Sequence, residues 1–125
     1  MDDMGYHTLW DITGVDENLL EDASTLHQFF LSTLNCSSFT VLNHLTHKFD
    51  EGGKGVTGLY LLSESHLSYH TYPESKYISI DVYTCGSDNR CVNEPILSFF
   101  GGSTKVSTST ILRGSRSTDQ DGDVK

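Results

Sequence analysis

The sequence predicts an α+β fold in which one antiparallel β-sheet has helices packed on one face, a two-layer α/β sandwich. Several segments rich in β-branched and aromatic residues follow one another across short turns, and one long segment has the apolar spacing of a helix. A chain of 125 residues suffices for one hydrophobic core. We therefore expect a single domain over residues 1–112, followed by a polar, disordered tail over residues 113–125.

The N-terminal part predicts a strand followed by a helix. Residues 6–13, "YHTLWDIT", alternate loosely between apolar and polar side chains, as a half-buried strand does. Asp16 is a suitable N-cap for a helix that we expect to run without a break over residues 17–35. Its apolar side chains recur at helical spacing and form a stripe that must cover another element: Leu19, Leu20, Ala23, Leu26, Phe30 and Leu34.

The middle of the chain predicts the rest of the sheet. Residues 39–49 read as an alternating strand with Phe39, Val41, Leu45 and Phe49 on one face. After the turn "DEGGKG", residues 56–63, 66–72 and 77–85 predict three consecutive antiparallel strands.

The C-terminal part is less regular. Residues 89–100, "NRCVNEPILSFF", predict a short second helix with Pro95 in its first turn or at its end. Residues 104–112, "TKVSTSTIL", predict a last strand at the edge of the sheet.

Composition restricts the partners. Eight Lys and Arg against seventeen Asp and Glu give a formal charge of -9, which disfavours binding to nucleic acid or an anionic membrane through a basic face. The chain has no long apolar run, and its opening lacks the pattern of a secretory signal, so we expect a cytoplasmic protein. The three cysteines, Cys36, Cys85 and Cys91, have no metal-ligand spacing, so we expect free thiols and no metal.

Reactive side chains gather in "LLSESHLSYH", residues 61–70, at a predicted hairpin turn. Taken alone, "SESH" is typical of a solvated corner, and a single histidine such as His70 is commonly structural. The longer block "GVTGLYLLSESHLSYHTYPESKYISIDVYTCG", residues 55–86, closely resembles the S-adenosylmethionine decarboxylases of the bacterial and archaeal type. These are pyruvoyl-dependent enzymes of polyamine synthesis, and the likeness extends more weakly upstream to about residue 4.

The resemblance implies that the chain is a proenzyme that cuts itself between Glu64 and Ser65. The Ser65 hydroxyl would attack the preceding carbonyl, and elimination from the resulting ester would leave a pyruvoyl group at position 65. By the same resemblance His70 is the processing base and Thr57 supplies a hydroxyl that assists processing. The resemblance further implies that the pyruvoyl group would form a Schiff base with the substrate amine and that Cys85 would then donate a proton to the decarboxylated carbon.

Substrate recognition is also implied by the resemblance. Phe49 and His70 are expected to sandwich the adenine ring of S-adenosylmethionine, and Glu74 is expected to reach the ribose hydroxyls, from the same subunit or from its partner. Two processed two-chain protomers are expected to form a homodimer. The product, decarboxylated S-adenosylmethionine, is the aminopropyl donor for spermidine.

Two other functions fit the same residues. A pyruvoyl-dependent decarboxylase of ornithine or arginine would use Ser65, His70 and Cys85 in the same way, because these residues act on the α-amine and α-carbon that all three substrates share. An unprocessed, inactive homologue would keep the fold as a binding or regulatory partner. Three departures from the family favour this last alternative: the longer loop "DEGGKG", the shortened C-terminal region, and Tyr72, which stands where the family usually has Trp.

Overall fold

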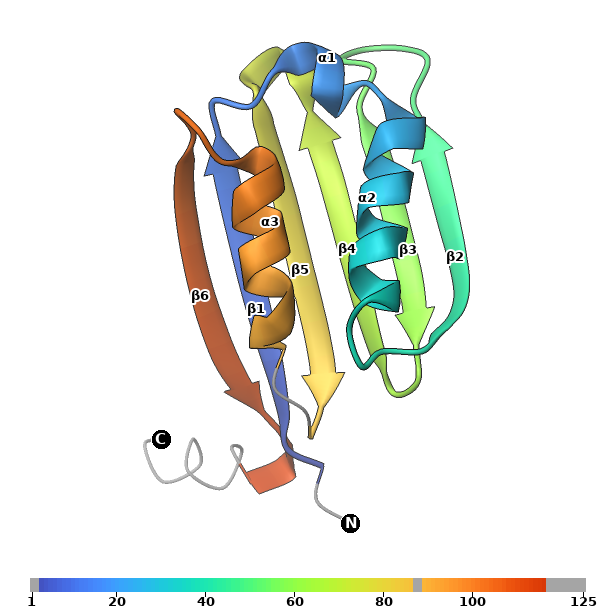
Figure 1. Cartoon of the computed structure of the whole chain (residues 1–125), viewed down its shortest axis with the longest axis vertical. Coiled ribbons are helices and arrows are strands. Elements are labelled where there is room, and N and C mark those ends of the chain that lie inside the picture. The colour runs from blue at the N-terminus through green and yellow to red at the C-terminus, as the bar shows by residue number, and fades with distance from the viewer. Residues whose placement is uncertain (1–2, 87–88, 117–125) are drawn as a thin grey trace.

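In the computed structural model, which describes residues 3–86 and 89–116, the chain folds into one six-stranded antiparallel sheet. Figure 1 shows the strands side by side in the order β2-β3-β4-β5-β1-β6. Their bounds are β1 Gly5–Thr13, β2 Val41–Lys48, β3 Val56–Leu62, β4 Ser65–Tyr72, β5 Tyr77–Cys85 and β6 Lys105–Arg113. The predicted α+β sandwich is confirmed. Residues 117–125 of the predicted tail lie outside the described part of the chain.

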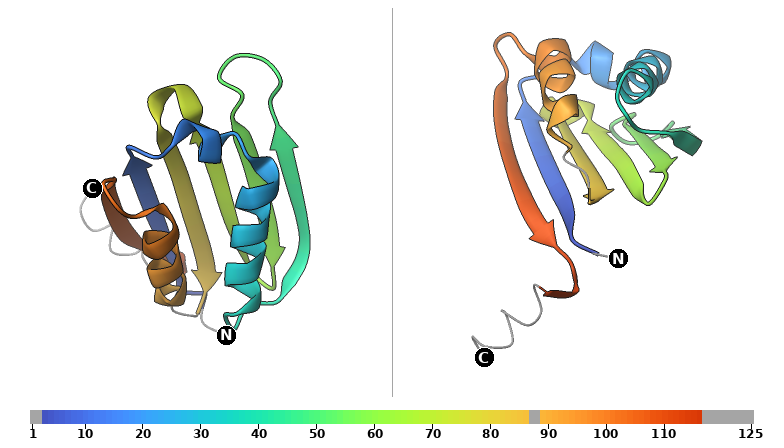
Figure 2. Two further views of the ribbon diagram at one scale, coloured as in Figure 1. Left: turned by 45° about the horizontal axis from the view of Figure 1, so that its top comes forward. Right: turned by 60° about the horizontal axis from the view of Figure 1, so that its bottom comes forward.

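The two longer helices lie on the same face of the sheet (Figure 2). In Figure 1, α2 (Ala23–Asn35) lies over the side of the sheet that contains β3 and β4, and α3 (Asn93–Phe100) lies over β5 and β1. Three short helical turns complete the fold: α1 Glu17–Leu20, η1 Pro73–Ser75 and η2 Arg90–Val92. None of the helices described is long and apolar enough to cross a membrane. We call the face without helices the open face.

The helix expected over residues 17–35 is broken in two. Asp16 caps α1 by accepting from the backbone N–H of Asn18, as predicted. The chain leaves the helix after Leu20, and Asp22 starts a new one by accepting from the backbone N–H and the hydroxyl of Thr25. The carboxylate of Asp22 satisfies the Thr25 N–H, which a continuous helix would have bonded to one of its own carbonyls, so the single-helix prediction is wrong at this point.

The predicted face of the 39–49 strand is also wrong. A bulge between Val41 and Asn43 adds one residue to β2. Val41 therefore lies opposite the buried Leu62, whereas Leu45 lies opposite Leu59 on the open face and is 67% exposed. Because side chains alternate along a strand, one extra residue moves every later side chain to the other face.

The core lies between the sheet and the two longer helices. Phe30 of α2 is fully buried, and its ring stacks on Tyr69 of β4 with centroids 4.4 Å apart. Phe29 and Phe99 stack at 4.0 Å and join α2 to α3. Pro95 lies in the first turn of α3, where its missing N–H costs no helix hydrogen bond. The helices thereby cover one face of the sheet and leave the side chains of the open face uncovered.

We expect Phe30→Ala to lower the free energy of unfolding by about 3–5 kcal/mol, because it removes a buried ring and leaves a cavity. Urea denaturation measures this change in a Ser65→Ala background, which removes the hydroxyl required for the expected self-cleavage. Leu42→Ala is the control, since Leu42 is 59% exposed. A loss below about 1 kcal/mol for Phe30→Ala would contradict the packing described here.

Candidate active site

The hairpin that joins β3 to β4 contains the predicted cleavage bond. Leu62 pairs with Ser65, so only Ser63 and Glu64 form the connection. Glu64 has a backbone φ of 61°, in the left-handed region that residues other than glycine rarely adopt. A residue held there costs of order 1–3 kcal/mol. The peptide bond expected to rearrange therefore follows a strained residue at a tight turn.

Ser65 lies beside the end of β5. The backbone N–H of Cys85, the last residue of β5, donates a hydrogen bond to Ser65 Oγ at 3.3 Å. On the other side of Cys85 the paired residue is Gly5 of β1. A Cβ at Gly5 would lie 2.7 Å from the carbonyl oxygen of Thr84 and 2.9 Å from the hydroxyl of Tyr83. A larger residue would therefore disturb the strand end that holds Ser65 and Cys85 together.

A second cluster lies at the opposite end of β4, where the structure brings together the other four predicted residues. Thr57 pairs with His70, and Thr57 Oγ1 lies 2.9 Å from His70 Nδ1 in a shared hydrogen bond. Both residues line a cavity of ≈ 270 Å³. Phe49 and Glu74 line it too, and its remaining lining residues are Glu51, Gly53, Gly55, Thr71 and Tyr72.

The loop from Asp50 to Gly55 forms one wall of this cavity. The backbone N–H of Phe49 donates to the carbonyl of Gly55 at 2.8 Å, which closes the loop. A Cβ at Gly53 would lie 1.6 Å from Glu74 Oε2, so the Glu74 carboxylate lies directly against loop backbone. Phe49 remains 48% exposed above the cavity. The cavity thus offers an accessible aromatic face and two carboxylates, those of Glu51 and Glu74.

The hydroxyl of Tyr77, next to the cavity-lining Tyr72, stays protonated near neutral pH. Tyr72 and Tyr77 stack with centroids 5.5 Å apart, and Tyr77 donates a hydrogen bond to Asp11. Burial, and then the hydrogen bond to Asp11 and its negative charge, raise the pKa of Tyr77 to about 12. Tyr77 therefore acts as a neutral donor near neutral pH.

The two clusters are separated along the sheet. Ser65 and His70 are five residues apart on β4, or about 17 Å at the rise of a strand. Within one chain His70 therefore does not reach the Ser65 hydroxyl. The structure groups Ser65 with Cys85, and it groups Thr57 with His70, Phe49 and Glu74.

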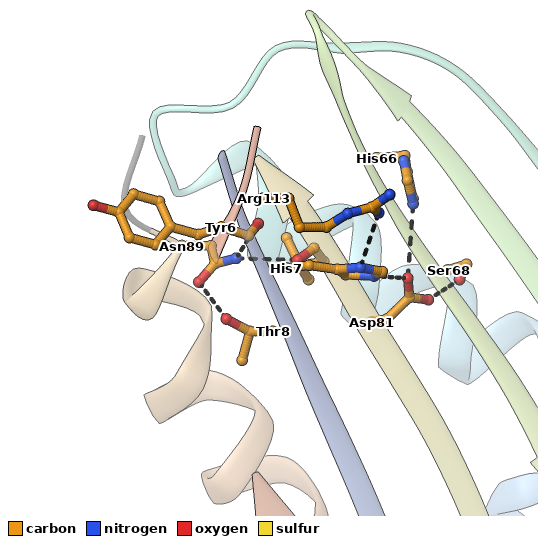
Figure 3. A network of polar contacts seen from close by, with 9 residues as sticks. Tyr6, His7, Thr8, His66, Ser68, Asp81, Asn89 and Arg113 are labelled. Atoms are coloured by element: carbon orange, nitrogen blue, oxygen red, sulfur yellow. Dashed lines mark hydrogen bonds and ion pairs between the residues drawn. The ribbon is translucent and has the colours of Figure 1, made fainter. Parts of the chain in front are cut away.

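A third group of polar side chains lies on the open face, and the sequence analysis missed it. His7 Nε2 lies 2.7 Å and His66 Nε2 lies 3.7 Å from Asp81 Oδ2, and Ser68 Oγ donates to Asp81 Oδ1 (Figure 3). Arg113 Nη1 approaches His7 Nδ1 at 3.4 Å. Strand alternation in residues 6–13, 66–72 and 77–85 was the available signal, but the strand order that joins them is not visible in sequence.

This group has the two imidazoles and the carboxylate of a metal site, with all three ligand atoms within 4.8 Å of one another. Its hydrogen bonds fit a metal poorly. A metal-bound histidine donates its second ring N–H to an acceptor, whereas His7 Nδ1 faces Arg113, which can only donate. The side chains instead bond to one another: Asp81 accepts from Ser68 and pairs with His7, and Arg113 faces the second nitrogen of His7.

Comparison with known proteins points to one family. A family model described as S-adenosylmethionine decarboxylase matches residues 6–114. The S-adenosylmethionine decarboxylase proenzyme 2 of Bacillus anthracis is 48% identical over 83 residues, which are 66% of each chain. The chain thus matches just under two thirds of the length of that relative.

Two longer matches cover nearly the whole chain. The S-adenosylmethionine decarboxylase proenzyme of Geobacillus kaustophilus is 37% identical over 117 residues, 93% of this chain and 92% of the relative. The crystal structure of the adenosylmethionine decarboxylase from Aquifex aeolicus superposes with a TM-score of 0.79 at 25% identity, covering 91% of this chain and 93% of that one. By its sequence and by its fold, the chain belongs to the S-adenosylmethionine decarboxylase family.

Proposed function

We propose that this chain is a self-processing, pyruvoyl-dependent decarboxylase of S-adenosylmethionine, which makes the aminopropyl donor for spermidine. The observation that carries the proposal is the strained turn at Glu64, followed directly by a serine whose hydroxyl is held by the Cys85 backbone. Family membership supports the same reading. Cleavage between Glu64 and Ser65 would divide the chain into residues 1–64 and residues 65–125.

The chain's own groups favour the first step of cleavage. The two-residue connection keeps the Ser65 hydroxyl next to the carbonyl of Glu64, and attack by that hydroxyl replaces the peptide bond with an ester. Cutting releases Glu64 from its left-handed conformation, so the strain favours the cut state by of order 1–3 kcal/mol. The Cys85 N–H holds the Ser65 oxygen in place, which lowers the entropy cost of reaching the geometry needed for attack.

Ser65 also fits the expected origin of the prosthetic group. It opens β4, so a group formed there would head the second chain while the rest of that strand stays paired with β3 and β5. A pyruvoyl group supplies an electron sink for an amino acid bound through its amine, which amino-acid decarboxylation requires. The thiol of Cys85 is the nearby proton donor, provided that it is protonated when the donor step occurs.

The cavity at the other end of β4 fits a nucleoside with a positive charge. The exposed Phe49 ring and the His70 ring both line it, which allows a flat base to stack. The Glu74 carboxylate can accept hydrogen bonds from ribose hydroxyls, and Glu51 adds negative charge that suits a sulfonium. These features favour S-adenosylmethionine over free ornithine or arginine.

The separation of the two clusters supports a homodimer with composite sites. A two-fold axis across the open faces would place the Cys85 side chain and the new chain start at residue 65 of one protomer against the Thr57–His70 end of the other. The open face also exposes large apolar side chains that such packing would bury: Leu45, Leu59 and Leu61 are 67%, 47% and 55% exposed. A shared site thus brings together groups about 17 Å apart in one chain.

Ser65→Ala is expected to leave a single uncut chain without decarboxylase activity, because alanine has no hydroxyl to attack the carbonyl. Denaturing electrophoresis and intact mass distinguish the products. The wild type should give two chains, the second lighter than a simple hydrolysis product by the elements of ammonia. Ser63→Ala removes a hydroxyl from the same turn and should still be cut. A wild-type chain that stays whole would favour the unprocessed-homologue alternative.

Carbon dioxide release from labelled S-adenosylmethionine, ornithine and arginine tests the substrate. We expect turnover of the first alone, and Phe49→Ala should raise its KM about 3- to 10-fold with little change in kcat, since a stacking contact contributes about 0.5–1.5 kcal/mol. Leu42→Ala serves as the surface control. Turnover of ornithine or arginine without S-adenosylmethionine would establish the alternative substrate class.

Co-expression of Cys85→Ala with His70→Ala tests the composite site. In a mixed dimer one site would combine the intact Ser65–Cys85 end of one chain with the intact His70 of the other, so random pairing should restore about one quarter of wild-type sites. Each variant alone should remain near background. A site built within one chain predicts no restoration, and that result would exclude the shared arrangement.

A further inference from the structure

Four neighbouring strands contribute to the polar group on the open face, which we call the Asp81 network: Arg113, His7, Asp81, Ser68 and His66 (Figure 3). Asp81 is its centre. One carboxylate oxygen faces both imidazoles, and the other accepts from Ser68. The proposed cleavage and substrate-binding steps use none of these side chains.

The network holds its two imidazoles differently. The guanidinium of Arg113 can only donate, so His7 Nδ1 faces it as an acceptor and His7 Nε2 carries the proton that faces Asp81. This arrangement fixes one neutral tautomer of His7. His66 lies 3.7 Å from Asp81 with a side chain that is 45% exposed, against 19% for His7. His66 therefore faces Asp81 and is, in the single chain, the more accessible of the two imidazoles.

The register places this network beside Cys85. Tyr83 of β5 pairs with His66 on β4 and with His7 on β1. Cys85 lies two residues further along the same face of β5, which makes it a diagonal neighbour of both imidazoles. Such neighbours have Cβ atoms roughly 7–8 Å apart, a gap that side chains or one water can span.

The surroundings separate the network from the cleavage chemistry. The Tyr83 ring packs against His7, His66 and Arg113 at 5.7, 5.8 and 5.3 Å. Ser65 directly precedes His66 on β4, and neighbouring side chains on a strand point to opposite faces, so the Ser65 side chain points to the helix face. The network therefore faces the thiol and not the serine hydroxyl.

We propose that the Asp81 network returns to Cys85 the proton that this thiol delivers in each turnover, with His66 as carrier and Asp81 as its positioning residue. The inference rests on the proposed function. When Cys85 S–H gives its proton to the substrate α-carbon, a thiolate remains. Protonated His66 then transfers a proton to the sulfur and becomes neutral, and it takes up another from solvent. Arg113 and His7 act by holding Asp81 in place.

Asp81→Asn is the principal test, because it keeps the shape and removes the charge. We expect normal self-cleavage, a kcat lowered about tenfold or more, and a KM within about twofold of wild type, since the lost group serves proton transfer and not binding. Asp22→Asn is the matched control on the helix face, where asparagine caps as well as aspartate. An uncut Asp81→Asn chain, or an unchanged kcat, would overturn the inference.

Two further measurements separate proton supply from a structural role. Imidazole added to His66→Ala should restore kcat in proportion to its protonated fraction, and lack of rescue would contradict the carrier role. In the uncut Ser65→Ala chain, ¹⁵N–¹H spectra should show the Nε2–H tautomer of His7, and a predominant Nδ1–H tautomer would refute the network. A wild-type chain that is neither cut nor active would instead overturn the proposed function itself.

Discussion

The pairing of β4 with its two neighbours is the constraint on which the remaining structure depends. β4 lies between β3 and β5, and its alternating side chains put Leu67 and Tyr69 into the core and His66 and His70 on the open face. Burial on one face fixes this register, since a slip of one residue would expose the core residues. The same register sets the spacing between the reactive turn at one end and the cavity at the other. The hydrogen bonds that pair β4 with β3 and β5 therefore set both the packing of the core and the positions of the candidate site residues.

Much of the fold could be predicted from local patterns. The strand over residues 77–85 has the predicted bounds, and the last strand lies at the edge of the sheet as expected. The errors occur where one polar or extra residue competes with a regular pattern. The carboxylate of Asp22 starts a second helix, and the bulge at Val41 reverses the faces of β2. Neither choice is visible from hydrophobic periodicity alone.

The candidate site was predicted residue by residue but not as an arrangement. The resemblance supplied Ser65, Cys85, Thr57 and His70, and the structure sorts them into two pairs at opposite ends of a strand. Asp81 and its partners were missed because they come from strands far apart in the sequence. β1 joins the sheet between β5 and β6, and this non-sequential placement brings His7 next to Asp81. Sequence patterns show which face of the sheet a side chain lies on, but the order of the strands determines which residues it contacts.

That placement of β1 also determines how a cut protein would hold together. Cleavage after residue 64 assigns β1, β2 and β3 to one polypeptide and β4, β5 and β6 to the other. Across the sheet the two polypeptides then alternate, because β1 of the first is inserted between β5 and β6 of the second. Neither piece can leave without breaking ladders on both sides of β1 as well as the β3–β4 ladder. The nicked molecule is interlocked, so its two pieces separate only by unfolding.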